Sequence, residues 1–113
     1  MLTASDAVLV LTTLPTGADG AGWGRRLVEA RLAACVSVLP GLTSVYRWRD
    51  AAGQETIEDA AEQQIVIKTT PARLEALKAW LAANHPYEVP ELLVLPVAGG
   101  GDAYLAWISS STR

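Results

Sequence analysis

The sequence has few of the residues from which disulfides, metal clusters and catalytic dyads are built. Its 113 residues include one cysteine, Cys35, and one histidine, His85. A lone cysteine excludes an internal disulfide and fits a reducing compartment, so we expect a cytoplasmic protein. No spacing of the Cys-x-x-Cys or His-Glu-x-x-His type is present, so one chain cannot enclose a structural zinc ion.

Positive charge and long apolar runs are also lacking. The formal net charge of −3 gives no excess of basic residues with which to bind nucleic acid. No apolar run approaches the roughly 20 residues of a membrane helix, and residues 1–15 lack a basic start followed by a cleavable apolar core. Half of the residues are hydrophobic, which excludes a disordered chain, and the length predicts a single domain over residues 1–113.

What is present first is a strand followed by a helix. Residues 7–13 form a continuous apolar run, which is typical of a central strand, and Pro15 closes it. Apolar residues at helical spacing then run from Trp23 to Ala34. Because glycine is a poor helix former, we expect this helix to begin near Trp23 and not within the glycine-rich residues 17–22.

A long antiparallel hairpin follows the helix. Residues 36–49 read as a strand interrupted at residues 40–41, and a turn at residues 50–53 folds the chain back towards the alternating strand 65–69. Acidic residues on the returning arm suit cross-strand pairing with the arginines of the first arm. The acidic cluster is therefore interpreted as a solvated strand face and not as a cation site.

The second half of the chain predicts a helix, a strand and a shorter helix. Thr70 and the proline after it start the first of these helices, and His85 with Pro86 ends it. Residues 92–96 form an apolar strand. Asp102 is expected to cap a short helix in which one face carries Tyr104, Trp107 and Ile108.

The order β-α-β-β-α-β predicts an α+β fold of the ferredoxin-like kind, with an extra short C-terminal helix. Both main helices cover one face of an antiparallel sheet, and the other face has no helix. Tyr46, Trp48, Ile65 and Ile67 supply more apolar surface than two helices readily hide. Because long exposed edges invite aggregation, we infer that the hairpin pairs with another subunit.

The loop that ends the second helix holds the only histidine. Pro86 cannot continue a helix, and it pushes His85 into an extended conformation before rigid backbone. Two interpretations stay open: His85 interacts with the last helix carbonyls, or it is a functional residue on a connecting loop. Glu88 and Glu91 could coordinate a hard cation or be solvated carboxylates.

Other candidates also have two interpretations each. Cys35 could be a metal ligand or nucleophile with His85, or a small buried residue between helix and sheet, which is the structural role we expect. Lys68 could bind an anion or extend along the surface. Trp48, Tyr87 and Trp107 could line a pocket between subunits, although core packing predicts the same residue types.

Five segments, in this order and spacing, resemble the CutA divalent-cation-tolerance family. The resemblance runs from about Val8 to Ile108. The segments are residues 31–36 (RLAACV), 44–48 (SVYRW), 62–70 (EQQIVIKTT), 85–92 (HPYEVPEL) and 104–108 (YLAWI). Five ordered motifs over nearly the whole chain make chance similarity an inadequate explanation.

The resemblance implies a ferredoxin-like homotrimer of PII-like architecture, with strands paired between subunits and a link to copper tolerance. It implies His85, Glu88 and Cys35 as metal ligands and no established enzymatic activity. Thr12 stands where some bacterial members have a copper-binding cysteine, and its hydroxyl is no soft ligand. The nominated pocket and interface residues are Tyr46, Trp48, Lys68, Tyr87, Glu91 and Trp107.

Three functions stay open at this point. The first is a non-catalytic trimer that binds a divalent cation such as copper, or a small ligand, in an intersubunit cleft around His85. The second is an enzyme that uses Cys35 or His85. The third is a structural or signalling trimer without metal chemistry.

Overall fold

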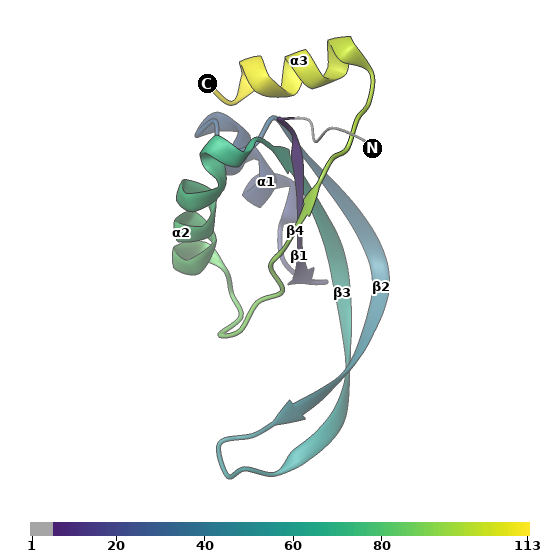
Figure 1. Cartoon of the computed structure of the whole chain (residues 1–113). Helices are drawn as coiled ribbons and strands as arrows, with labels where there is room; N and C mark the ends of the chain where they lie inside the picture. Colours follow the sequence, from purple (N-terminus) through teal and green to yellow (C-terminus); the bar gives the residue numbers. More distant parts are fainter. Residues whose placement is uncertain (1–5) are drawn as a thin grey trace.

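The computed structural model describes residues 6–113, so the first five residues of the predicted domain lie outside the described part (Figure 1). A short 3₁₀ turn at Pro71–Arg73 precedes the second helix. The elements are β1 (Val8–Pro15), α1 (Gly20–Glu29), β2 (Cys35–Arg49), β3 (Glu55–Thr69), α2 (Leu74–Asn84), β4 (Leu93–Pro96) and α3 (Asp102–Ser111). No helix within residues 6–113 has the length and apolar character needed to span a bilayer.

The four strands form one antiparallel sheet in the order β2-β3-β1-β4. α1 and α2 pack on one face of this sheet, and α3 lies across one end of it (Figure 1). The predicted α+β, ferredoxin-like fold with an additional C-terminal helix is therefore confirmed. We call the opposite surface of the sheet the helix-free face.

The core lies between the sheet and the two main helices. Val10 of β1 stands opposite Ile67 of β3, and both side chains point towards the helices. Leu27 from α1 and Leu77 from α2 close over them, and all four are almost completely buried. Burying a side chain of this size stabilises the fold by about 1.5–3 kcal/mol.

Ile65 and Ile67 correct one expectation about the uncovered surface. The helices hide both isoleucines fully, at 0% exposure, whereas Tyr46 and Trp48 are each 42% exposed. The apolar surface that the helices leave uncovered is therefore concentrated on the hairpin and not on the whole of β3.

The hairpin is longer than the sequence indicated, with 15 residues in each arm. β1 pairs with β3 only as far as Glu62, so the part from Leu42 to Ala61, here called the outer hairpin, pairs with no strand other than β2 and β3. The predicted interruption at residues 40–41 is a register shift between Leu39 and Leu42 within one continuous strand. Figure 1 shows the outer hairpin projecting beyond the helices as a curved ribbon.

The first helix differs from the prediction at both ends. It begins at Gly20, because the Asp19 carboxylate accepts the Gly22 N–H at 3.0 Å and caps the first turn. A Cβ on Gly24 would lie 2.9 Å from a methyl of Val36, so close packing on β2 explains a glycine inside this helix.

The same helix ends at Glu29, several residues before the predicted end. Ala34 therefore lies outside the helix. Cys35 is the first residue of β2 and does not terminate a helix.

Two predicted caps are also replaced by other contacts. Thr70 makes no capping bond to the following turn; its hydroxyl lies 3.2 Å from that of Thr112. Gly101, and not Asp102, occupies the cap position of α3, while Asp102 stands in the first turn. There its negative charge is still favourable to the helix dipole.

Candidate functional site

His85 is held between the end of β1 and the loop that follows α2. Its Nε2 lies 2.9 Å from the carbonyl oxygen of Thr13 and 3.0 Å from the hydroxyl of Thr12. Its Nδ1 accepts the backbone N–H of Tyr87 at 3.1 Å. Burial lowers the pKa of His85, although the Thr13 carbonyl and the charge of Glu62 act in the opposite direction. The ring is therefore a neutral, fully hydrogen-bonded group.

Tyr87 carries this network to Glu62. The Tyr87 hydroxyl donates a hydrogen bond of 2.7 Å to the Glu62 carboxylate, which is only 6% exposed. Burial alone would raise the pKa of Glu62, but hydrogen bonds from Ser44, Tyr87 and Thr13 outweigh it and lower the pKa. Burial and the contact with Glu62 raise the pKa of Tyr87 well above its usual range. Near neutral pH the pair is a carboxylate and a phenol.

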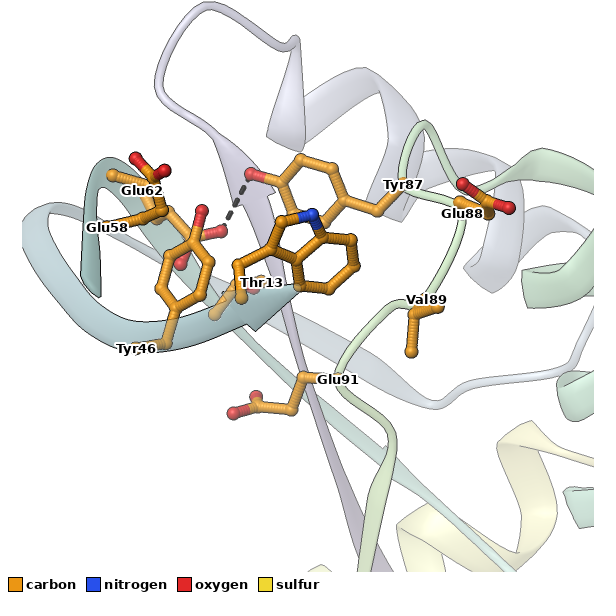
Figure 2. A pocket seen from close by; sticks show the side chains of 10 residues that line it. Thr13, Tyr46, Glu58, Glu62, Tyr87, Glu88, Val89 and Glu91 are labelled. Atoms are coloured by element: carbon orange, nitrogen blue, oxygen red, sulfur yellow. Dashed lines mark hydrogen bonds between the residues drawn. The ribbon is translucent and has the colours of Figure 1, made fainter. Parts of the chain in front are cut away.

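These two residues form part of the wall of a cleft with a volume of about 410 Å³. The outer hairpin supplies Tyr46 and Glu58 on one side, and the loop after α2 supplies Glu88 and Val89 on the other (Figure 2). Four carboxylates line it, and its aromatic residues are Tyr46, Trp48 and Tyr87. The Tyr46 and Trp48 rings contact each other edge to face, with centroids 6.4 Å apart. The cleft thus combines negative charge with aromatic surface.

The structure brings together several of the residues nominated from the sequence. Those that line the cleft are Tyr46, Trp48, Tyr87, Glu88 and Glu91. His85 lies next to the cleft, since its ring packs against Tyr87 with centroids 5.2 Å apart, but it does not line it. Glu88 and Glu91 are exposed at the cleft, which keeps their carboxylates accessible.

Cys35 lies elsewhere, and its expected position was wrong. Cys35 pairs with Lys68 of β3. The Lys68 side chain points to the helix-free face because the preceding Ile67 points to the helices, so Cys35, its cross-strand partner, lies on that face as well. Thr13, which binds His85, pairs with Gln64. Gln64 lies four residues before Lys68 on β3, a separation of about 13 Å. Cys35 is partly exposed and is not enclosed between helix and sheet. A Cys35–His85 pair does not form within one chain.

Lys68 and Trp107 also lie away from the cleft. The Lys68 ammonium donates to the Tyr104 hydroxyl at 3.1 Å and stands 5.5 Å from the centre of that ring. The hydrogen bond that Lys68 donates to Tyr104 raises the pKa of Lys68. Trp107 packs beside Tyr104, with ring centroids 5.4 Å apart, and is 44% exposed on α3. Both residues belong to a second aromatic surface at the α3 end of the sheet.

No group of three or more His, Cys, Asp or Glu side chains within residues 6–113 is arranged to hold a metal ion. The three predicted ligands are divided in this chain: Glu88 lines the cleft, His85 is hydrogen-bonded beside it, and Cys35 stands near Lys68. Any metal site built from all three would need side chains from more than one subunit.

The sequence reasoning passed over Thr13, Glu58 and Glu62. The two glutamates were interpreted as a solvated strand face, yet Glu58 pairs with Tyr46 across the hairpin and Glu62 is buried. Glu58, Ala60 and Glu62 are spaced two residues apart, which places their side chains on the same face of the hairpin as Tyr46. This spacing was the sequence signal that could have assigned both glutamates to the cleft. The predicted ion pairing holds on the opposite face, where Arg47 and Arg49 contact Glu55 at 2.8 and 3.0 Å.

Comparisons with known proteins agree with the fold and the motifs. A family model described as CutA1 divalent ion tolerance protein matches residues 8–111. The divalent-cation tolerance protein CutA of Pectobacterium atrosepticum is 44% identical over 108 residues, which cover 96% of this chain and 94% of that protein.

Solved structures give the same result. CutA of Xylella fastidiosa superposes with a TM-score of 0.86 at 39% identity, covering 96% of this chain and 100% of that one. CutA of Synechococcus elongatus, solved in complex with a Bis-Tris molecule, has a TM-score of 0.83 at 42% identity, covering 98% and 97%. The chain belongs to the CutA divalent-cation-tolerance family.

Proposed function

We propose that residues 1–113 act as a single domain that assembles into a cytoplasmic homotrimer and binds a cation in the cleft beside Tyr87. The protein would take part in the response to divalent metal ions without catalysing a reaction. The observation that carries this proposal is Glu62, an ionised carboxylate buried in the wall of an aromatic cleft. A buried negative charge is stabilised further by a bound positive charge.

The chemistry of the cleft favours a hard divalent cation over copper, with water molecules or a neighbouring subunit completing the coordination, because the carboxylates of one chain are not grouped to hold an ion by themselves within residues 6–113. Its acidic groups are the carboxylates Glu58, Glu62, Glu88 and Glu91. Hard cations take oxygen ligands, whereas copper favours imidazole and thiolate. Both nitrogens of His85 are occupied by hydrogen bonds, and Cys35 lies at a different place on the sheet. Copper binding would require ligands from a neighbouring subunit.

A small organic cation is the second candidate ligand. Tyr46, Trp48 and Tyr87 line the cleft, and a positive group over aromatic rings is attracted by about 0.5–2 kcal/mol. The related CutA of Synechococcus elongatus was solved with Bis-Tris, a polyhydroxylated amine. This complex supports a role for small amines as ligands within the family.

Trimer formation is supported by the outer hairpin. Tyr46 and Trp48 are each 42% exposed on one face of the hairpin, whereas the exposed Val45 and Ile57 lie on its opposite face. An exposed pair of aromatic rings in contact with each other is typical of a surface that a partner covers. A neighbouring subunit packed on this hairpin would also close the cleft, because Tyr46 and Trp48 belong to both surfaces.

The absence of catalysis is proposed from the position of the two reactive side chains. A nucleophile needs a base within hydrogen-bonding reach, and Cys35 lies about 13 Å along the sheet from Thr13, which binds His85. The family is likewise named for tolerance of divalent ions and not for a reaction.

The proposal is tested by calorimetric titration of the purified protein with Mn²⁺ and with Cu²⁺. Glu62→Gln should weaken Mn²⁺ binding at least tenfold, about 1.4 kcal/mol, because it removes the buried charge. The matched control is Glu55→Gln, which removes a carboxylate from the opposite face of the same strand. Equal Mn²⁺ affinity in both variants would refute the cleft as the cation site. The same pair titrated with Bis-Tris tests the organic cation.

A further inference from the structure

We propose that His85 is a positioning residue, which fixes Tyr87 against Glu62 through both of its ring nitrogens and does not itself coordinate a cation. The proposal rests on the cleft described above as the binding site. It assigns the only histidine of the chain a role in shaping that site and assigns ligand contact to the carboxylates and aromatic rings.

The contacts of the ring determine its tautomer. A backbone N–H can only donate, so Nδ1, which lies 3.1 Å from the Tyr87 nitrogen, must present a lone pair. A carbonyl oxygen can only accept, so Nε2, which lies 2.9 Å from the Thr13 oxygen, must carry the hydrogen. The two requirements agree on one neutral form, protonated at Nε2. The Thr12 hydroxyl, 3.0 Å from Nε2, is close enough to share that hydrogen.

In this tautomer the single lone pair of the ring, at Nδ1, already accepts the Tyr87 N–H, so none is free for a metal ion. A metal binds the unprotonated nitrogen of a neutral imidazole, which here is Nδ1. Coordination at Nδ1 would displace the Tyr87 N–H, and coordination at Nε2 would displace its hydrogen from the Thr13 carbonyl. Either change would release the loop that carries Tyr87, Glu88 and Glu91 into the cleft.

The first helix holds the ring in this orientation. Trp23 contacts His85 edge to face, with centroids 5.9 Å apart and planes at 86°. The indole N–H of Trp23 donates to the carbonyl of Asn84 at 3.2 Å, which fixes the residue just before His85. Asn84 also accepts a 2.8 Å hydrogen bond from Arg26 through its side chain. The ring is thus restrained by α1 as well as by β1.

The restraint is transmitted to the cleft through Tyr87. Its backbone N–H binds His85, and its hydroxyl binds Glu62 at 2.7 Å. One continuous path therefore joins Thr13, His85, Tyr87 and Glu62, and links β1, the loop after α2 and β3. A change at His85 should reach Glu62 by displacing the tyrosine.

The tautomer is measurable directly, because one histidine gives one set of imidazole signals. We expect long-range ¹H–¹⁵N spectra of untagged, ¹⁵N-labelled protein near neutral pH to place Nδ1 in the unprotonated range and Nε2 in the protonated range. The diamagnetic ion Zn²⁺, added to calorimetric saturation, should leave both shifts unchanged. A protonated Nδ1, or a shift of either nitrogen to its metal-bound position, would overturn the proposal.

Three variants separate the two hydrogen bonds of His85, one with the Tyr87 N–H and one with the Thr13 carbonyl. The amide oxygen of His85→Asn can accept the Tyr87 N–H, because asparagine bonds to the backbone two residues on. The amide nitrogen of His85→Gln reaches further and can donate to Thr13. The NMR signals of the Tyr87 ring are assigned by comparison with Tyr87→Phe. Their chemical shifts should change to an intermediate extent in His85→Asn and His85→Gln, and most in His85→Ala.

The amide variants decide the outcome if His85→Ala does not fold. Tyr87 signals that match the wild type in both His85→Asn and His85→Gln would overturn the positioning role. The proposed function fails separately: if Zn²⁺ and Mn²⁺ do not bind the wild type at all, the cation site is refuted. The tautomer and the Tyr87 signals of the ligand-free protein still decide the role of His85.

Discussion

The body of the molecule and its outer hairpin treat apolar residues in opposite ways, although β2 and β3 run through both. In the body, Ile67 and Leu77 are fully buried between the sheet and the helices. In the outer hairpin, Val45 and Ile57 are 66% and 59% exposed. The body is stabilised by its own packing, whereas the hairpin leaves apolar side chains exposed on both of its faces.

The polar contacts of the two regions differ as well. On the outer hairpin, Arg47 and Arg49 share the single carboxylate of Glu55 in largely exposed ion pairs, each worth about 0–1 kcal/mol. Next to the body, Glu62 is buried and hydrogen-bonded by Tyr87. Carboxylates on one strand therefore have different roles, which are set by the face and the distance from the helices.

The largest expected effect is loss of assembly. Trp48→Lys should prevent trimer formation, because it places a charge within the exposed aromatic surface that the neighbouring subunit would desolvate. Light scattering should give three times the 12.0 kDa chain mass for the wild type and the mass of one chain for the variant. Arg47→Lys, on the opposite face, is the control and should stay trimeric. A monomeric wild type at low micromolar concentration would remove the role of the hairpin as an interface.

The second prediction compares one substitution in the two regions of β3. Ile67→Ala should lower the free energy of unfolding by about 2–5 kcal/mol, because it opens a cavity in the core. Ile57→Ala removes the same atoms from an exposed position and should cost about 0.5 kcal/mol or less. Urea unfolding of both variants gives the two values. A cost of several kcal/mol for Ile57→Ala would mean that a partner covers this face too.

The order of elements was predictable because it depends on local signals. Alternation marked the arms of the hairpin, and Pro86 marked the end of α2. The length of α1 was not predictable in this way. Its start depends on the Asp19 cap, and the close packing of Gly24 on Val36 explains a glycine that helix propensity disfavours.

The candidate site was predictable in part for the same reason. The aromatic cleft residues stand in distinctive segments, so Tyr46 and Tyr87 were found. The partners of His85 were not, since Thr13 lies 72 residues away in the sequence. The buried position of Glu62 depends on the register across the shift between Leu39 and Leu42, which single-chain patterning does not determine.

A smaller effect on stability is expected from pH, and it arises in the body of the molecule and not in the outer hairpin. Burial holds the pKa of folded His85 below the ordinary imidazole value of about 6.5, so the unfolded chain binds more protons in that range. Stability should therefore be complete above about pH 6.5 and fall as the pH drops through the folded pKa. The lowered pKa of Glu62 acts in the same direction at more acidic pH.

Urea unfolding midpoints measured between about pH 7 and pH 5 test this sign. His85→Asn has no imidazole, so its midpoint should change less with pH than that of the wild type over this interval. A wild-type midpoint that rises as the solution is acidified would contradict the neutral, buried state of the ring.

The smallest effect is expected at Cys35, which starts β2 on the helix-free face. Its thiol is partly exposed and lies 3.9 Å from the Ser37 hydroxyl, and it is not among the buried core residues. Cys35→Ser should therefore change the free energy of unfolding by about 0.5 kcal/mol or less and leave the imidazole spectrum of His85 unchanged. A thiol reagent should modify Cys35 without prior unfolding, with urea-unfolded protein as the reference for full reactivity. Strong protection in the native protein would show that a neighbouring subunit covers the body, so that the contrast between the two regions would hold only within one chain.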